Sequence, residues 1–371
     1  MTDRPTRDAA PRTPEDRDDA DASRPSAVRG GAGARRVEAR PGDPSRRVAL
    51  GGLLAGTVGA ATGLRSGVAR AQAGDWPNRP IRIVVPYAPG GGTDLTARLM
   101  ATRLSATFGQ PVVVENRPGA SANIGTEVVA RAPADGYTVL VTAPNFATSE
   151  ALFERLSWSM KDFAPVMQLV RYPNVLVAGP NAPYPDLRTL LARAKAAPGT
   201  ISYGSAGTAS MAHLGTELLG LRSGVKLQHV PYKGSGPLKV DLMGGHVPLA
   251  ADGLSSQIEA IRAGSIKALA VLAPKRWPAA PDIPGLADFG IDDVDGTGWY
   301  GALVPAKTPP AIVAKLHDAL AAALQAPEVR ERIGTLGLEA VGGTPDAFGR
   351  FLEGEGRKWA DVIRTGQIRS E

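Results

Sequence analysis

The sequence predicts an α/β fold made of two units, each with its own sheet. Apolar runs of strand length alternate with amphipathic stretches of helix length over residues 81–141, and a second alternating series begins near residue 175. Such alternation is typical of a parallel sheet covered by helices on both faces. One glycine-rich or small-residue turn joins a strand to a helix in each series, at residues 86–94 and 204–210. The length of 371 residues suits about two domains.

The first unit is expected to form three strands and two helices. Its strands are predicted at residues 81–85, 111–114 and 137–141, and its helices at residues 95–108 and 124–131. Thr93 and Asp94 offer side-chain oxygens that could cap the first helix, and Asn123 is a candidate cap for the second.

The second unit continues the alternation. Its strands are predicted at residues 175–178, 201–203, 225–230, 247–251 and 266–272, and its helices at residues 187–197, 211–221, 236–243 and 255–263. A last apolar strand at residues 299–304 precedes three helices, at residues 310–324, 328–336 and 347–363. These three helices have no strands of their own, so they should pack on the first unit. The chain should then cross between the units near residues 171–178 and 297–304.

The composition excludes several classes of site and partner. The chain has no cysteine, so disulfides, thiolate metal sites and cysteine catalysis are excluded. The formal net charge is +6, but residues 1–73 carry 13 arginines, no lysine and 9 acidic residues, which is +4 of that total. The remainder is nearly neutral, and its charge therefore gives no argument for nucleic-acid binding.

The N-terminal segment is typical of an export leader. Residues 1–45 are rich in charged and small residues and are predicted to be disordered. Residues 46–73 read as a signal peptide, with Arg46-Arg47, an apolar run and a final A-x-A site. The paired arginines suggest the twin-arginine route. An uncleaved anchor is the alternative. We expect cleavage near Ala73 and a location in the periplasm.

The turn at residues 86–94 is predicted to form an anion site. It follows a buried strand and leads into a helix N-terminus, where free backbone N–H groups and the helix dipole favour a negative charge. Glycine leaves the backbone open to a ligand. The Thr93-Asp94 pair after Gly92 does not fit a Walker loop, and Leu95 stands where a dinucleotide fingerprint needs its third glycine. A carboxylate is therefore favoured over a nucleotide. A tight turn with no ligand remains the alternative.

An enzyme is the rival class. His213, His229, His246 and His317 include no pair with metal-ligand spacing, and each is expected to be structural or exposed. The stretch at residues 203–207 has the serine of a hydrolase elbow, but tyrosine stands where its first glycine is needed. No catalytic triad is apparent, and we expect neither catalysis nor a cofactor nor a metal.

Seven patches in order give the chain a specific resemblance to a known family. They are WPNRPI (76–81), PYAPGGGTD (86–94), VENRPGA (114–120), ADGYT (134–138), VPYKG (230–234), LAV (269–271) and WYG (299–301). With them, the sequence from about residue 76 to residue 363 resembles the Bug receptors, the periplasmic solute-binding receptors of tripartite tricarboxylate transporters.

The resemblance implies a two-lobed type II periplasmic-binding-protein fold with two crossing strands. Lobe 1 would comprise residues 74–175 and 303–371, and lobe 2 residues 176–302. The ligand would lie between the lobes, its carboxylates held mainly by backbone N–H groups of two facing loops. The implied ligand-binding residues are Tyr87, Ala88, Pro89, Gly90, Gly91, Gly92, Thr93, Asp94, Asn145, Ser149, Ser205, Ala206, Gly207, Thr208, Ala209 and Asp252, with Ser210 ending the second loop.

Two features of the sequence leave the identity of the ligand undetermined. Ser149 and Glu150 replace the Asn-Pro that the family usually has, and Phe146 lies in the same site-lining segment, so the ligand could differ from the family's usual acids. Asp252 would repel a second carboxylate and suggests a ligand with a donor group; capping the helix at residues 255–263 is the equal alternative.

The resemblance predicts a monomeric receptor that delivers a small carboxylated solute to membrane transporter subunits. A ligand-loaded sensor for a signalling partner would use the same site.

Overall fold

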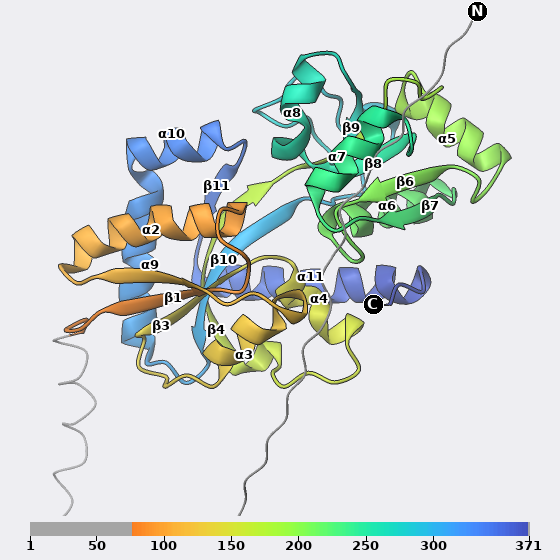
Figure 1. Cartoon of the computed structure of the whole chain (residues 1–371). Helices are drawn as coiled ribbons and strands as arrows, with labels where there is room; N and C mark the ends of the chain where they lie inside the picture. Colours follow the sequence, from red (N-terminus) through yellow and green to blue (C-terminus); the bar gives the residue numbers. More distant parts are fainter. Residues whose placement is uncertain (1–75, 370–371) are drawn as a thin grey trace, which may run out of the picture. The chain divides into compact units, whose positions relative to one another are not determined.

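The computed structural model describes residues 76–369, and the expected leader and signal peptide lie outside this range. The predicted α/β class is confirmed, because the strands form two separate sheets covered by helices (Figure 1). In the part of the chain that is described, no helix combines the length and apolar character needed to span a membrane.

The first sheet has six strands in the order β11-β4-β10-β3-β1-β2. These are β1 (Ile81–Val85), β2 (Val112–Asn116), β3 (Thr138–Thr142), β4 (Phe163–Tyr172), β10 (Gly298–Pro305) and β11 (Glu339–Gly342). β1 is parallel to β2 and β3, whereas β10 is antiparallel to β3 and β4. The parallel arrangement predicted for the strands of residues 81–141 is confirmed, but the whole sheet is mixed, because β10 and the two strands that were missed, β4 and β11, are antiparallel.

The second sheet has five strands in the order β7-β6-β8-β5-β9. These are β5 (Asn174–Ala178), β6 (Ser202–Ser205), β7 (Gln228–Pro231), β8 (Leu249–Gly253) and β9 (Lys267–Val271). β6 is parallel to β7 and β8, and β5 is antiparallel to β8 and β9. This sheet is mixed as well, because β5 enters from the first sheet.

We call the first sheet with its helices lobe 1 and the second sheet with its helices lobe 2. The helices of lobe 1 are α2 (Gly92–Phe108), α3 (Asn123–Ala130), α4 (Asn145–Leu152), α9 (Pro310–Gln325) and α10 (Pro327–Thr335). Those of lobe 2 are α5 (Leu187–Ala196), α6 (Met211–Ser223), α7 (Ser235–Gly244) and α8 (Leu254–Arg262). Three short 3-10 turns lie at Ala120–Ala122, Met160–Asp162 and Leu286–Phe289.

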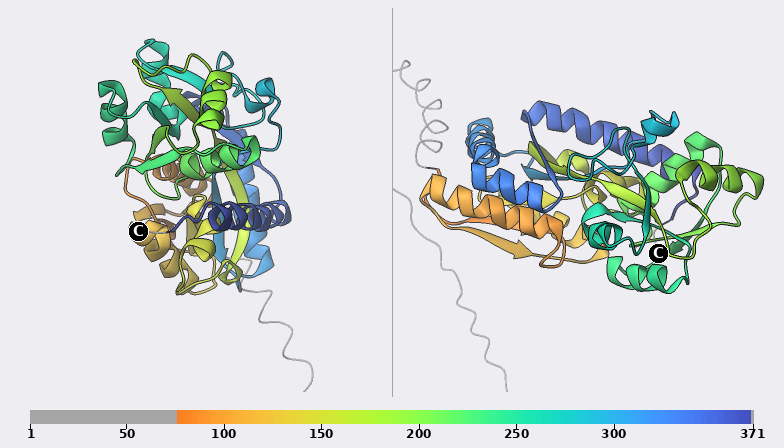
Figure 2. Two further views of the ribbon diagram at one scale, coloured as in Figure 1. Left: turned by 90° about the vertical axis from the view of Figure 1, so that its right-hand side faces the viewer. Right: turned by 90° about the horizontal axis from the view of Figure 1, so that it is seen from above.

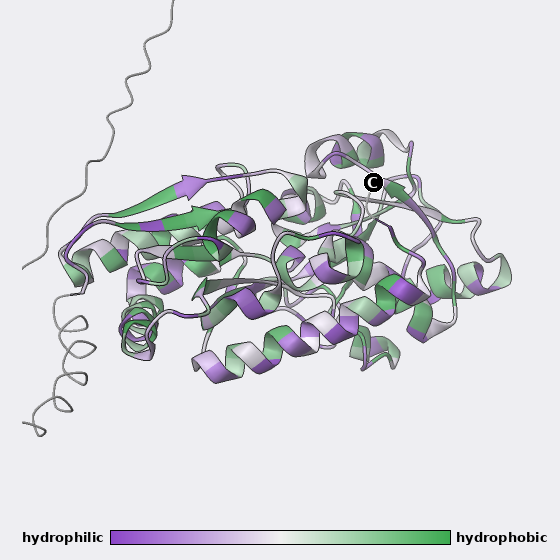
Figure 3. Cartoon of the chain, turned by 90° about the horizontal axis from the view of Figure 1, so that it is seen from below, coloured by the Kyte–Doolittle hydropathy of each residue, from purple (hydrophilic) through white to green (hydrophobic). Residues whose placement is uncertain are grey.

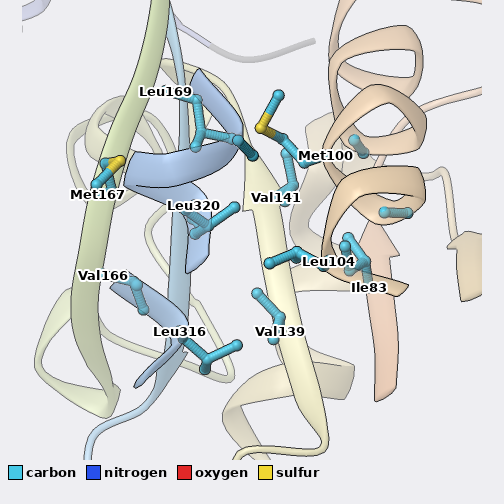
Figure 4. Packing of buried hydrophobic residues seen from close by; sticks show 14 of the residues in the cluster. Ile83, Met100, Leu104, Val139, Val141, Val166, Met167, Leu169, Leu316 and Leu320 are labelled. Carbon is cyan, nitrogen blue, oxygen red and sulfur yellow. The ribbon is translucent and has the colours of Figure 1, made fainter. Parts of the chain in front are cut away.

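The core of lobe 1 holds the first loop and its helix in place. Met100 and Leu104 of α2 pack toward Ile83 of β1, and Leu316 and Leu320 of α9 complete the layer (Figure 4). Each fully buried aliphatic side chain contributes about 1.5–3 kcal/mol to stability. The helices carry both hydrophilic and hydrophobic residues, as expected where one face covers a sheet (Figure 3). The N-terminus of α2 is thus fixed at the end of β1.

The last helix corrects an expectation. α11 (Pro345–Thr365) packs against α4 and β4 of lobe 1 and also against α6 of lobe 2 (Figure 2). Its Phe348 belongs to a lobe 1 cluster, whereas Trp359 and Val362 lie in the core of lobe 2. The three C-terminal helices therefore do not all belong to lobe 1.

The chain passes from one sheet to the other at two points. β4 ends at Tyr172 and β5 begins at Asn174, while β10 enters the first sheet at Gly298. Asn174 donates to the carbonyl of Gly296 at 2.7 Å, which ties the two crossing segments together. The second crossing therefore precedes the boundary expected at residue 303.

Candidate binding site

The first loop presents an uncapped helix N-terminus. Gly91 is the N-cap of α2, and no side chain caps the helix. Thr93 and Asp94 lie within the first turn, so the prediction that they cap the helix is wrong. Ala88, Pro89, Gly90 and Gly91 are exposed. The first-turn N–H groups of α2 thus have no side-chain cap and lie directly behind an exposed turn, the arrangement of an anion site.

Asp94 shapes this loop rather than facing a ligand. Its carboxylate is 2% exposed and accepts from the Gly90 amide at 2.9 Å, from Asn116 at 2.9 Å and from Arg98 at 2.9 Å. Burial alone would raise the pKa of Asp94, but the bonds from Arg98, Gly90 and Asn116 outweigh it and lower this pKa. An ionised Asp94 thus pulls the glycine turn toward the start of α2.

A tyrosine cluster lies beneath the loop, and the sequence did not reveal it. A Cβ at Gly92 would overlap the hydroxyl of Tyr300, so only glycine fits there. The rings of Tyr300 and Tyr172 lie 4.9 Å apart, and the Tyr87 hydroxyl donates to Asn145 Oδ1 at 3.3 Å. Burial raises the pKa of each of these three tyrosines, so their hydroxyls stay protonated and able to donate.

Asp252 connects this cluster to lobe 2. It lies at the end of β8, is 4% exposed, and accepts from Ser235 at 2.9 Å and from Gln257 at 2.9 Å. α8 has Gly253 as its N-cap and no side-chain cap, so the capping interpretation of Asp252 is wrong. Burial raises the pKa of Asp252, and the charge of its carboxylate in turn helps to raise that of Tyr172.

The second loop differs from the first because it is closed on itself. Ser210 caps α6 by accepting from the His213 amide at 3.3 Å. The Gly207 amide donates to Ser205 Oγ at 3.3 Å, and the Ala209 amide donates to His213 Nδ1 at 2.9 Å. Backbone amides of both loops were expected to hold the ligand, but the amides of Gly207 and Ala209 already have partners within lobe 2.

Neighbouring bonds connect the second loop to Asp252. The Gly234 amide donates to the carbonyl of Ala206 at 3.0 Å, and Ser235, the next residue, donates to Asp252. Thr208 is half-buried and Ala209 is buried. Hydrogen bonds thus run from the second loop to Asp252, and the charge of Asp252 acts on Tyr172 of the cluster beneath Gly92.

The segment that starts α4 contributes less than expected. Asn145 contacts Tyr87, but Ser149 is 1% exposed and donates to the Asn145 carbonyl at 2.8 Å, so its proton is used within the helix. Phe146 is buried and stacks on Trp158 at 5.3 Å. The idea that Phe146 alters the ligand site is therefore wrong, because its ring faces the core.

One contact, between Ser205 and His229, bears on the alternative that the protein is an enzyme. Ser205 Oγ lies 2.7 Å from His229 Nε2, as in a nucleophile–base pair. The hydroxyl is 0% exposed and also donates to the Gly207 carbonyl at 2.9 Å, so no substrate carbonyl can reach it. Among the described residues no group of three or more metal-ligating side chains is found.

Three further side chains of the patches that carry the resemblance lie outside the loops described above. The Tyr232 hydroxyl donates to Asp241 at 2.9 Å, and Lys233 is exposed. Trp299 is 1% exposed and packs in the core against the rings of Phe348 and Phe351.

Comparison with known proteins gives a consistent picture. Residues 96–368 match the family described as "Tripartite tricarboxylate transporter family receptor". The chain is 36% identical to the protein BugT of Bordetella pertussis over 86% of this chain and 97% of BugT.

Two solved structures are similar over nearly their whole length. Rpa4515 of R. palustris with adipate has a TM-score of 0.70 and 36% identity, covering 79% of this chain and 99% of that one. MatC of Rhodopseudomonas palustris with bound malate has a TM-score of 0.67 and 31% identity, covering 78% of this chain and 100% of that one.

Proposed function

The chain belongs to the tripartite tricarboxylate transporter family of receptors, and from this premise we propose that it binds a small carboxylated solute at the first loop. The observation that carries the proposal is the uncapped N-terminus of α2 behind an exposed glycine turn. The solute lies between lobe 1 and lobe 2, near the points where the chain crosses from one sheet to the other. The receptor acts as a monomer and delivers the solute to membrane transporter subunits.

Backbone amides suit a receptor that must later release its load. Each hydrogen bond to a charged group contributes about 1.5–3 kcal/mol, so a few of them support roughly micromolar binding, about −8 kcal/mol. Because the two loops differ, one carboxylate is held at α2, while Asp252 and Ser235 meet a donor or hydroxyl elsewhere on the solute.

A thermal-shift screen against small carboxylic acids tests this function. A ligand at about a hundred times its dissociation constant adds about 2.7 kcal/mol to stability, which raises the melting temperature by a few degrees. We expect a shift with one class of di- or hydroxy-acid. The absence of any shift, before and after unfolding and refolding to remove resident ligand, would contradict the proposal.

Replacing Asp252 by asparagine is expected to change ligand preference more than stability. Asparagine has the same size as aspartate and keeps one of the two side-chain oxygens that accept from Ser235 and Gln257. It removes the negative charge that favours a hydrogen-bond donor on the solute. The preference for malate over succinate should fall by about tenfold, the effect of one bond to a charged group. Titration of both acids measures this, and an unchanged ratio would remove Asp252 from the site.

We also propose that the protein reaches the periplasm through the twin-arginine route, with cleavage near Ala73. Exchange of Arg46 and Arg47 for lysine should leave most of the precursor in the cytoplasm. Fractionation of cells followed by mass measurement of the exported chain tests both points. Normal export of the variant would indicate the general secretory route.

A further inference from the structure

A cluster of two buried rings and one half-buried ring beneath the second loop has no part in the function described so far. His213 of α6 and His229 of β7 stack with ring centroids 3.6 Å apart and an interplanar angle of 9°. Tyr203 of β6 lies 5.2 Å from the His229 ring. Two imidazoles stacked this closely cannot both be charged, since two positive charges there would repel strongly, and burial of the rings favours the neutral form of each.

The hydrogen bonds fix the protonation of His213. Its Nδ1 accepts the buried amide of Ala209 at 2.9 Å, so Nδ1 carries a lone pair and no proton. Its Nε2 lies 3.9 Å from Glu217 Oε1, and that carboxylate accepts from the Tyr203 hydroxyl at 2.7 Å. A proton on Nδ1 would place the His213 N–H against the Ala209 N–H, and the hydrogen bond to the loop would be lost.

Ala209 depends on this contact. Its φ of +57° lies in the left-handed region, which costs a non-glycine residue about 1 kcal/mol or more. Gly207, with φ of +149°, supplies the other unusual turn of the loop. Without an acceptor, the buried Ala209 N–H would be unpaired and the loop would lose the bond that offsets its strain.

We infer that His213 is a positioning residue for the solute site: its Nδ1 lone pair holds the Ala209 amide and so fixes the loop at residues 205–210 in its binding conformation. The link to the site is the Ala206 carbonyl, which receives the Gly234 amide beside Ser235 and Asp252. The inference rests on the proposed function for its consequence in binding, but the loop geometry can be tested without a ligand.

The surroundings make this contact sensitive to acid. Burial lowers the pKa of His213 to about 3, with the neighbouring His229 adding to the effect, and burial lowers the pKa of His229 to about 4. Burial raises the pKa of Glu217, while Tyr203 and Lys226 oppose that rise.

Two buried carboxylates lie on elements packed against α6, and both are bonded. On α11, Glu355 pairs with Lys358, and on β8, Asp252 is bonded to Ser235 and Gln257. A histidine in the opened loop has its ordinary pKa near 6.5. The pKa of His213 in the folded loop lies below that value. The stabilisation of the loop by this contact is therefore complete above about pH 6.5 and decreases as the pH falls toward the folded pKa.

Hydrogen exchange on the purified full chain tests the inference directly. In His213→Phe the ring stack is kept but the acceptor is lost, and protection of the peptide spanning residues 205–212 should fall about tenfold or more. In His213→Asn the side-chain oxygen replaces Nδ1, and protection should stay within about threefold of wild type. Thr216→Val is the matched control, since it removes a buried hydroxyl bond to the Ala212 carbonyl one turn along the same helix.

The pH profile separates positioning from mere packing. Between pH 6.5 and 4.5, the protection of this peptide in wild type should fall about tenfold more per pH unit than in His213→Asn, which keeps His229 but has no titrating ring at position 213. Equal slopes, full protection in His213→Phe, or equal loss in His213→Phe and His213→Asn would each overturn the inference.

Titration with malate as the probe then connects the loop to binding. We expect affinity about tenfold weaker in His213→Phe and within about threefold of wild type in His213→Asn. Undiminished malate binding in His213→Phe would overturn the role in binding while the proposed function stands. If wild type binds neither malate nor any acid of the screen, the proposed function fails, and hydrogen exchange alone still decides whether His213 holds the loop.

Discussion

Replacement of Gly91 by aspartate is expected to abolish carboxylate binding while the protein still folds. Gly91 is exposed and its φ of −76° and ψ of 166° suit any residue. A Cβ there meets only the Ala88 carbonyl at 3.8 Å. Aspartate is a preferred N-cap, so its carboxylate would take the first-turn amides of α2 and repel an incoming anion.

The expected loss of affinity is large. Removing two charge-assisted hydrogen bonds of about 1.5–3 kcal/mol each weakens binding by about a hundredfold or more. The melting temperature without ligand should stay the same or rise slightly, because the new cap contributes about 1 kcal/mol. Gly91→Ala is the matched control: it adds the same Cβ without an acceptor and should bind normally. Full affinity in Gly91→Asp would exclude the first loop as the carboxylate site.

Replacement of Glu355 by alanine is expected to give the largest loss of stability. This carboxylate is 5% exposed on α11, where it accepts from Trp359 at 2.8 Å and from Trp299 at 3.3 Å and pairs with Lys358 at 2.5 Å. Trp299 belongs to a lobe 1 cluster and Trp359 to the core of lobe 2. Alanine would leave two indole N–H groups without this acceptor, at a cost of about 3 kcal/mol.

Thermal unfolding measures this cost. A loss of about 3 kcal/mol lowers the melting temperature of a domain of this size by about 5 °C or more. Glu353→Ala on the same helix is the control, because Glu353 is exposed and its pair with Arg357 at 3.8 Å contributes little. Equal stability of the two variants would show that Glu355 does not hold α11 to the lobes.

Local patterns predicted the first loop well. The strand at residues 81–85, the glycine turn and the following helix depend on neighbouring residues, and the structure has all three in order. The strand β4 was missed because Pro165 and the polar residues Gln168 and Arg171 interrupt its apolar pattern. Pro165 is tolerated because β11 pairs with β4 only at residues 168–171, so no strand needs an N–H from residue 165 on that side.

The rest of the site depends on contacts that no local pattern encodes. Tyr172 and Tyr300 come from distant segments, and they meet under Gly92 only because the crossing strands β4 and β10 place them together. Likewise, Asp94 and Ser210 are both residue types that commonly cap helices. In the structure Asp94 accepts from the Gly90 amide, whereas Ser210 caps α6. The asymmetry between the two loops therefore follows from tertiary partners.

Isothermal titration of the purified protein with the acid found by the screen, and with the matching amide, tests the central claim most directly. The two compounds have nearly the same shape, and only the acid carries the negative charge that the N-terminus of α2 favours. We expect roughly micromolar binding of the acid and at least a hundredfold weaker binding of the amide. Equal affinity for the two compounds would contradict the account, because it would show that the carboxylate charge is not what this receptor recognises.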